Sequence, residues 1–364
     1  MLLTPDRRKR KVLPNGSSVK TLALRISLVG GLLCNLTSRA ADVLMVVNKS
    51  DDTVSFLDAK TGAQRGSVAV GKGPHEVELL ADGRTAAVSN YGTQAEPGSS
   101  LSLIAVDTRA AKPSIDLGHG TRPHGLRSLK DGRLLVTAEG TQELLIVDPG
   151  VGRVIDRIPT NRETSHMVAA APDGTRAYVA NIGSGSLTAV DLVGKKVLRD
   201  VPTGKGAEGI DISPSGREVW VTNRGSDTVS IIDAKSLETT ATLKAAEFPI
   251  RIKFTPDGKR ALVSCARSGD VLVFDVGARK ELLRIPLGLR AVPGSEQHLF
   301  ATRFGKSPAP VGLLIAPDGK RAWVASTNAD VVSEIDLLQS KTTRLLAAGR
   351  EPDGLAGAFE QSRR

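Results

Sequence analysis

A segment of about 42 residues recurs along this chain. Four clear copies read PDGTRAYVANIGSGSLTAVDL, PSGREVWVTNRGSDTVSIIDA, PDGKRALVSCARSGDVLVFDV and PDGKRAWVASTNADVVSEIDL. Three successive steps between turn glycines are 42 residues long, and two others are longer by 7 and 19 residues; these glycines are Gly83, Gly132, Gly174, Gly216, Gly258 and Gly319. Repeats of this length that hold four short alternating segments are typical of a β-propeller.

Seven repeats fit the length of the chain. Together with the two insertions they account for 320 of the 324 residues from 41 to 364. The first strand-like run, VLMVVN at 43–48, matches the second strand of a repeat, whereas DGLAGAF at 353–359 matches a first strand. We therefore expect an all-β, seven-bladed β-propeller in which the C-terminal strand completes blade 1. Such closure leaves no unpaired strand edge between the first and last blades.

The first 40 residues have the pattern of a signal peptide. Residues 26–36 form an apolar run that is too short to span a bilayer. Lys20 and Arg25 precede this run, and a small-x-small sequence that ends at Ala40 follows it. The pattern predicts cleavage after Ala40 and an exported protein, either periplasmic or secreted.

Residues 1–40 also account for most of the net charge. They contain eight Lys and Arg residues and one Asp, which is seven of the net +10 charges of the whole chain. Residues 41–364 therefore carry about +3, and this small excess argues against a nucleic-acid partner. Cys265 is the only cysteine of this part, so we expect no intrachain disulfide there. We expect residues 41–364 to form a single propeller domain without a transmembrane span.

The repeat form PDGxxxYVxN…VxxID extends over roughly residues 42–360. It resembles the YVTN-type β-propeller repeat proteins, of which the YncE-like exported proteins are typical. The resemblance implies a seven-bladed propeller outside the cytoplasm. It implies little about activity, because a fold of this type hosts many functions.

Two columns of the repeat have a structural interpretation. Tyr178, Trp220 and Trp323 share one position of the second strand, where we expect them to pack between blades. An aspartate ends every third strand and is expected to accept hydrogen bonds from the turn that follows. These aspartates are Asp58, Asp107, Asp148, Asp191, Asp233, Asp275 and Asp336.

One further column has the residue types of a metal site. It lies eight residues before each turn glycine, at the start of the first strand, and reads Asp353, His75, His124, His166, Glu208, Ile250 and Val311 from blade 1 to blade 7. The first strand of each blade is innermost, so these side chains are expected to surround one mouth of the central channel. Imidazoles and carboxylates suit Zn²⁺, Cu²⁺, Fe²⁺ or Mn²⁺. We therefore predict a metal site formed by His75, His124, His166, Glu208 and Asp353.

Both insertions are expected on the face of this mouth. One falls near residues 90–100, between the second and third strands of blade 2, and the other within 289–310, between blades 6 and 7. The longer one contains Arg303 and is expected to fold over the mouth near Ile250 and Val311. Long loops on a rigid scaffold are common sites of binding residues. Glu139 interrupts an asparagine column nearby and is expected to orient His124.

Two other functions stay open from the sequence. The segments GPHEVELLADG and RPHGLRSLKDG are similar to those of lactonase-type seven-bladed propellers. This resemblance implies a hydrolase whose histidine and carboxylate residues correspond to His75, His124, His166 and Glu208. His166 and Glu208 would act in catalysis, with Arg251 or Arg303 as the partner of an oxyanion. A scaffold that binds a protein partner is the third possibility. The leading hypothesis is an exported propeller that binds a metal ion or small ligand at the channel mouth.

Overall fold

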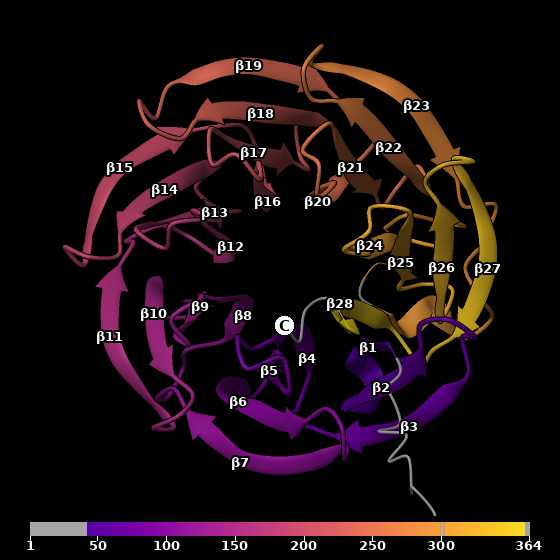
Figure 1. Ribbon diagram of the computed structural model, residues 1–364, viewed down its shortest axis with the longest axis horizontal. Coiled ribbons are helices and arrows are strands. Elements are labelled where there is room, and N and C mark those ends of the chain that lie inside the picture. Colours follow the sequence, from indigo (N-terminus) through magenta and orange to yellow (C-terminus); the bar gives the residue numbers. More distant parts are fainter. Residues whose placement is uncertain (1–41, 299, 301–302, 361–364) are drawn as a thin grey trace, which may run out of the picture. The chain divides into compact units, whose positions relative to one another are not determined.

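The structure is a computed structural model that describes residues 42–298, 300 and 303–360. The signal peptide predicted for residues 1–40 lies outside the described residues. The described chain forms seven four-stranded antiparallel sheets. These sheets are arranged as blades around a central axis (Figure 1). The described part of the chain contains no helix with the length and hydropathy needed to cross a membrane.

Each blade has an inner, a second, a third and an outer strand. The inner strands, from blade 1 to blade 7, are β28 (Pro352–Ala358), β4 (Pro74–Leu79), β8 (Pro123–Ser128), β12 (Ser165–Ala170), β16 (Ala207–Ile212), β20 (Pro249–Phe254) and β24 (Pro310–Ile315). The second strands are β1 (Val43–Asn48), β5 (Thr85–Gly92), β9 (Leu134–Ala138), β13 (Arg176–Asn181), β17 (Glu218–Asn223), β21 (Arg260–Cys265) and β25 (Arg321–Ser326).

The remaining strands lie toward the rim. The third strands are β2 (Thr53–Asp58), β6 (Pro97–Ala105), β10 (Glu143–Asp148), β14 (Ser186–Asp191), β18 (Thr228–Asp233), β22 (Asp270–Asp275) and β26 (Val331–Asp336). The outer strands are β3 (Gln64–Ala69), β7 (Ala110–Asp116), β11 (Arg153–Pro159), β15 (Lys196–Pro202), β19 (Thr239–Lys244), β23 (Lys280–Pro286) and β27 (Lys341–Ala347). Two short 3₁₀ turns, η1 (Lys49–Asp51) and η2 (Ser295–Gln297), complete the described elements.

The burial of the strands follows their residue types. The second strand β13, RAYVAN, is buried over five consecutive residues, because neighbouring blades pack on both of its faces. The outer strand β15, KVLRDVP, is mostly exposed. Strands whose sequences are polar, or alternate between polar and apolar residues, therefore lie at the rim. Strands with continuous apolar runs lie inside.

Blade 1 is closed by the C-terminal strand, as the sequence predicts. Strand β28 pairs antiparallel with β1, and Val43 lies opposite Ala358 in this ladder. The backbone N–H of Lys49 donates to the carbonyl of Glu351 beyond the ladder. The prediction of an all-β, seven-bladed propeller is thus confirmed.

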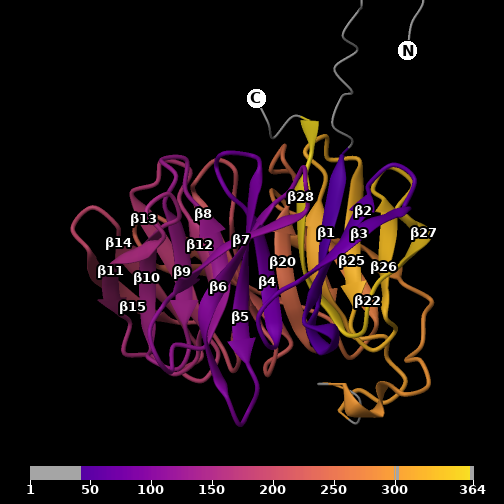
Figure 2. The ribbon, with the colours of Figure 1, turned by 90° about the horizontal axis from the view of Figure 1, so that it is seen from below.

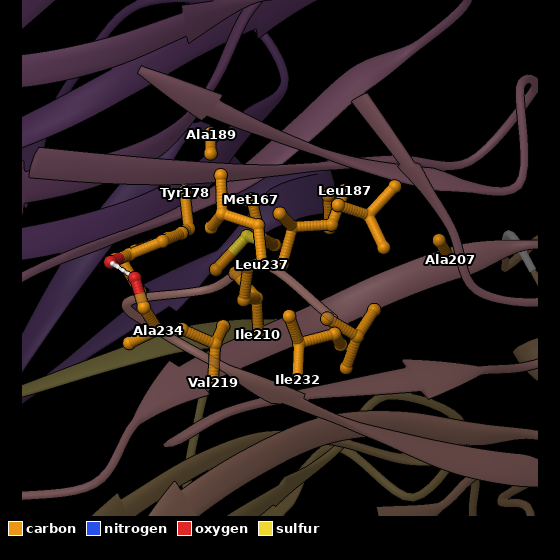
Figure 3. Close-up of a cluster of buried hydrophobic side chains, with 14 residues drawn as sticks. Met167, Tyr178, Leu187, Ala189, Ala207, Ile210, Val219, Ile232, Ala234 and Leu237 are labelled. Atoms are coloured by element: carbon orange, nitrogen blue, oxygen red, sulfur yellow. Dashed lines mark hydrogen bonds between the residues drawn. The ribbon is translucent and has the colours of Figure 1, made fainter. Parts of the chain in front are cut away.

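The cores lie in the seams between blades (Figure 3). In the seam between blades 4 and 5, Met167 and Tyr178 pack against Ile210, Val219 and other apolar side chains. The hydroxyl of Tyr178 donates to the carbonyl of Ala234, 3.1 Å away. The side chains in the same column of the other blades, Trp220 and Trp323, are fully buried in their own seams. The expected packing role of this column is confirmed.

Six of the seven aspartates predicted to end a third strand do so and bind the following turn, whereas β6 of blade 2 ends at Ala105, before Asp107. In blade 4, Oδ1 of Asp191 accepts hydrogen bonds from the backbone N–H groups of Val193 and Gly194, at 3.0 and 2.9 Å. In blade 5, Asp233 accepts equivalent bonds from Lys235 and Ser236. These bonds satisfy backbone donors in a turn that has no strand partner.

A β-bulge near the start of the inner strands positions the channel residues. In blade 3, Pro123 pairs with Ala138 and Leu126 with Val136, so His124 and Gly125 both lie opposite Thr137. The ladders of blades 2 and 5 shift at the same place. A bulge bends the strand and redirects side chains. This is how consecutive residues of an inner strand come to face the channel.

A hydroxyl on the second strand connects this bulge to the next blade. Oγ1 of Thr137 accepts the N–H of Gly125 at 2.8 Å and donates to the carbonyl of His166. Gly125 allows this close approach, because a Cβ at that position would lie 2.6 Å from the carbonyl oxygen of His166. Successive inner strands are therefore held in a fixed relation around the channel.

Both insertions project from one face of the propeller (Figure 2). The first lengthens β5 and β6 into a hairpin, and the second connects β23 to β24 and contains η2. The candidate site lies on this same face, where the inner strands β4, β8, β12, β16, β20 and β24 begin.

Candidate functional site

A cavity of 280 Å³ lies where the inner strands begin. The structure brings the whole predicted column to this cavity, together with Arg303 of the longer insertion. The column residues that line it are Asp353, His75, His124, His166, Glu208, Ile250 and Val311. The expectation that these side chains meet around one channel mouth therefore agrees with the structure. Metal binding and catalysis by them stay predictions.

Three histidines form a continuous row along blades 2 to 4. The ring centroids of His75 and His124 are 4.8 Å apart, and those of His124 and His166 are 3.7 Å apart. His124 and His166 are buried, with exposed fractions of 3% and 7%. Tyr91, at the end of β5, packs against His75 with a centroid distance of 4.5 Å.

Glu139 binds His166, and the sequence-based assignment to His124 is wrong. Oε1 of Glu139 contacts Nδ1 of His166, and Oε2 accepts a hydrogen bond of 2.6 Å from the hydroxyl of Tyr91. Glu139 follows the second strand of blade 3, and that end of the strand lies beside the inner strand of blade 4. The carboxylate therefore reaches the histidine of the next blade rather than that of its own blade.

His124, Glu139 and His166 are close enough to bind one metal ion. One ligand atom from each residue lies within 4.8 Å of the other two. Among the described residues, Nδ1 of His124 and Nε2 of His166 are buried without a hydrogen-bond partner. Buried polar atoms are normally paired, so the unpaired Nδ1 of His124 indicates a ligand site, beside Nε2 of His166, which makes no hydrogen bond in the described chain and lies 3.5 Å from Oε1 of Glu208.

Glu208 extends this group toward blade 5. Its Oε1 lies 3.5 Å from Nε2 of His166, and its Oε2 pairs with Arg224. Burial alone would raise the pKa of Glu208, but Arg224 and His166 lower it to about 2. Glu208 is therefore a carboxylate at neutral pH and lies next to the three-residue group.

The histidines differ in protonation. Burial lowers the pKa of His75 to about 3, and Lys49 adds to this effect. Burial also holds the pKa of His124 well below its usual value, and the neighbouring His166 and His75 act in the same direction. Burial opposes protonation of His166 as well, but Glu139 raises its pKa above the usual value. His75 and His124 are thus neutral imidazoles at neutral pH, the form that binds metals.

His75 and Asp353 each have a partner outside the row. Nδ1 of His75 donates to the carbonyl of Gly73 over 2.9 Å. Oδ2 of Asp353 pairs with Nζ of Lys49 at 3.2 Å. These two predicted ligands line the cavity but lie outside the three-residue group that meets at one point.

An ion pair that the sequence reasoning missed crosses the channel. Arg251 of blade 6 donates through Nη2 to Glu76 of blade 2, and its Nη1 lies 3.5 Å from Oε1 of Glu208. Both Arg251 and Glu76 are buried. They occupy a column of the repeat in which four of the seven blades carry glycine and blade 4 carries Met167. Opposite charges in a glycine column were the sequence signal for this pair.

Blades 6 and 7 form an apolar wall of the cavity. Ile250 and Val311 belong to a buried cluster with Phe248, Phe300 and Phe304. Arg303 lies over the ring of Phe248, with Cζ 4.8 Å from the centroid. The insertion between β23 and β24 thus folds over this part of the mouth, as expected from the sequence.

Comparison with known proteins supports the fold. The model of the Cytochrome D1 heme domain family matches residues 131–251, about a third of the chain. No curated protein shows a significant match. A chain in the structure of Kuenenia stuttgartiensis hydrazine synthase is similar with a TM-score of 0.63 and 19% identity, over 80% of this chain and 94% of that one.

A second solved structure gives the same result. It is a functionally unknown protein from Desulfotomaculum acetoxidans, with a TM-score of 0.70 and 13% identity, over 86% of this chain and 98% of that one. At these identities the likeness shows the fold alone. The site must therefore be interpreted from its own residues.

Proposed function

We propose that this protein binds a divalent transition metal at the channel mouth through His124, Glu139 and His166. The observation that supports the proposal most directly is the meeting of one ligand atom from each residue within 4.8 Å in a buried cavity. Glu208 is near enough to His166 to serve as a fourth ligand or as a base. The apolar and ion-paired surroundings would limit access of water to the centre.

The ligand set narrows the choice of metal. Two imidazoles and one or two carboxylates suit Zn²⁺, Cu²⁺, Fe²⁺ or Mn²⁺. A metal held by three protein ligands with an open position lowers the pKa of a bound water and makes a hydroxide available near neutral pH. Affinity does not identify the natural metal, because Cu²⁺ binds most nitrogen and oxygen sites tightest.

The partial match to a haem-domain family raises the question of haem. A histidine can serve as an axial ligand of haem iron. However, the cavity measures 280 Å³ and its lining includes Lys49, Glu139 and Asp353. A porphyrin has a large apolar surface, and sites for large ligands are bigger and predominantly apolar. The described cavity does not fit haem, and we assign no haem chemistry to it.

Metal binding can be measured on the full chain. Isothermal titration with Zn²⁺, Cu²⁺ and Mn²⁺ is expected to show one ion per chain. His166→Ala and His124→Ala are expected to weaken binding at least about tenfold, because each removes one ligand. His119→Ala is the matched control, since His119 is exposed and does not line the cavity.

The outcome that contradicts the proposal is equally clear. Stoichiometric binding that persists in His124→Ala and His166→Ala, or that falls equally in His119→Ala, would exclude this site. If the two histidine variants lose binding and the control does not, the metal content of protein purified from its natural compartment would identify which ion is used.

A hydrolase is the second candidate function. Arg303 and Arg251 line the same cavity as Glu208, so a cation and a carboxylate lie near His166. This arrangement favours the assignment of His166 and Glu208 as catalytic groups with Arg303 as the oxyanion partner. Turnover of simple lactones and esters that disappears in His166→Ala would support this function. Metal binding without any turnover would favour the first proposal.

The location of the protein is part of the proposal. The apolar run at 26–36 and the sequence that ends at Ala40 support export by a signal peptide. The repeat form supports membership of the YVTN-type, YncE-like proteins. Expression of the full chain in a bacterial host, followed by N-terminal sequencing of the exported fraction, is expected to show a chain that starts at Ala41. Uncleaved protein found only in the cytoplasm would contradict export.

A further inference from the structure

The apolar wall of the cavity has no role in metal binding. Ile250 and Val311 stand where the other five blades carry histidines or carboxylates. Together with Phe300, which is 7% exposed, they line the side formed by blades 6 and 7. The cavity is therefore divided into a half with metal-ligand side chains and an apolar half.

Three guanidinium groups gather beside the apolar half. The Cζ atoms of Arg303, Arg224 and Arg267 lie 4.8, 5.2 and 5.6 Å from the ring centroid of Phe248. Arg224 pairs with Glu208. Among the described residues, Arg267 and Arg303 have no carboxylate within salt-bridge distance. The cluster therefore has an excess of positive charge that cation–π contacts offset only in part.

Arg303 differs from the other cations of the cavity. Lys49 pairs with Asp353, Arg224 with Glu208, and Arg251 with Glu76. Arg303 lines the same cavity without such a partner in the described part of the chain. Arg303 is exposed at the rim of the cavity, and partial desolvation together with repulsion from Arg224 and Arg267 lowers its pKa. A bound anion would neutralise this group.

We infer that the cavity binds a small carboxylic acid with an apolar body, whose carboxylate pairs with Arg303 and whose body packs on Ile250, Val311 and Phe300. This inference rests on the proposed function, because the same cavity contains the metal ligands and the acid would lie beside the ion. A volume of 280 Å³ is at the lower end for ligand sites, so the body is about as large as one aromatic ring. An inorganic anion would leave the apolar wall without a partner.

The inference predicts a specific order of affinities. Isothermal titration of the full chain, with and without metal, would use benzoate, its neutral analogue benzyl alcohol, and inorganic phosphate. Benzoate is expected to bind at least about tenfold more tightly than either of the others. Arg303→Ala is expected to remove this advantage, and Arg303→Lys to restore part of it, because lysine retains the charge but not the planar fork.

Two further variants separate a binding role from a folding role. Arg290→Ala is the matched control, since Arg290 is an exposed arginine of the same insertion that lines a different hollow. It is expected to leave benzoate binding unchanged. Val311→Thr keeps the shape of the side chain and replaces one methyl group with a hydroxyl, so it is expected to weaken benzoate binding about threefold or more.

The outcomes distinguish this inference from the proposed function. Metal binding without benzoate binding, equal binding of phosphate and benzoate, or benzoate binding that is the same in Arg303→Ala would overturn the carboxylic-acid site alone. Benzoate binding that depends on Arg303 in a chain that binds no metal would retain the site and overturn the metal proposal.

Discussion

The two mouths of the central channel use polar and charged side chains in different ways. At the end of the inner strands, around a hollow of 460 Å³, Glu78 accepts the N–H of Ser128 and Asp211 accepts the N–H of Phe254, both at 3.0 Å. Each carboxylate thus joins its inner strand to the next one in the ring. At the histidine mouth, by contrast, His124 contacts other side chains of the column, and its Nδ1 has no hydrogen-bond partner in the described chain.

The difference helps to separate structural charges from functional ones in a repeat protein. A carboxylate that binds the backbone of the next blade stabilises the ring wherever it occurs. Metal-ligand groups that converge on one cavity, such as His124, Glu139 and His166, do not stabilise the ring by that arrangement, because buried ring nitrogens without a partner are unfavourable. Sites of this second kind are candidates for ligand binding.

The largest expected contrast concerns one arginine from each mouth. Arg251→Ala would leave Glu76 and Glu208 buried without this partner, and we expect a loss of about 3–5 kcal/mol in the free energy of unfolding. Arg127 of the opposite mouth is 28% exposed and lies 3.7 Å from Glu78. Arg127→Ala is expected to lower the free energy of unfolding by about 1 kcal/mol or less. Urea unfolding of the two variants measures the difference, and equal losses would contradict the distinction.

Metal is expected to stabilise only one mouth. At a metal concentration 100 times the dissociation constant, the free energy of unfolding should rise by about 2.7 kcal/mol, and a chelator should reverse the gain. The gain should disappear in His166→Ala. It should persist in Glu78→Gln, because Glu78 does not line the histidine cavity. Thermal unfolding with and without metal tests this prediction, and a gain that survives in His166→Ala would assign it to another site.

A smaller contrast concerns two hydroxyl groups. Thr137→Val removes the group that accepts the N–H of Gly125 and donates to the carbonyl of His166. We expect the free energy of unfolding to fall by about 1–2 kcal/mol. Oγ of Ser128, at the opposite mouth, has no hydrogen-bond partner among the described residues, so Ser128→Ala should change stability by less than about 0.5 kcal/mol. Denaturant unfolding compares them, and an equal effect would deny the connecting role of Thr137.

The smallest expected effect depends on pH and lies on the face of the opposite mouth. Hydrogen bonds from turn N–H groups lower the pKa of Asp233 below its usual value. The folded state therefore favours the ionised form, and this stabilisation is complete above the unfolded pKa of about 3.9. It is lost as the pH falls from there through the lower folded pKa. Asp233→Asn should reduce the acid sensitivity of unfolding below about pH 4, and an unchanged pH profile would contradict the capping role.

Much of the architecture could be predicted from the repeat. The spacing of the glycines, the strand that begins at Val43 and the strand-like end at Asp353 predict seven blades and their closure. The same register identified the column that contains His75, His124 and His166. A repeat fixes which residues occupy equivalent positions, and a propeller brings equivalent positions to one ring.

The contacts between blades could not be predicted in the same way. Glu139 contacts the histidine of the next blade because the second strand ends beside that blade, and a repeat alignment does not show this offset. The pair of Arg251 and Glu76 depends on the bulge that turns two successive residues toward the channel. The arginines around Phe248 include Arg303, which lies in an insertion and has no equivalent position in other blades.

The pairing of β28 with β1 has a consequence for the order in which the protein matures. The first sheet contains both the first and the last strand of the described chain, so a nascent chain cannot complete it until the final strand has left the ribosome. Asp353 belongs to β28, and the ring of residues around the cavity therefore becomes complete only after β28 has been synthesised. Any variant truncated before β28 would lack the strand that closes the ring and would also lack Asp353, which lines the cavity.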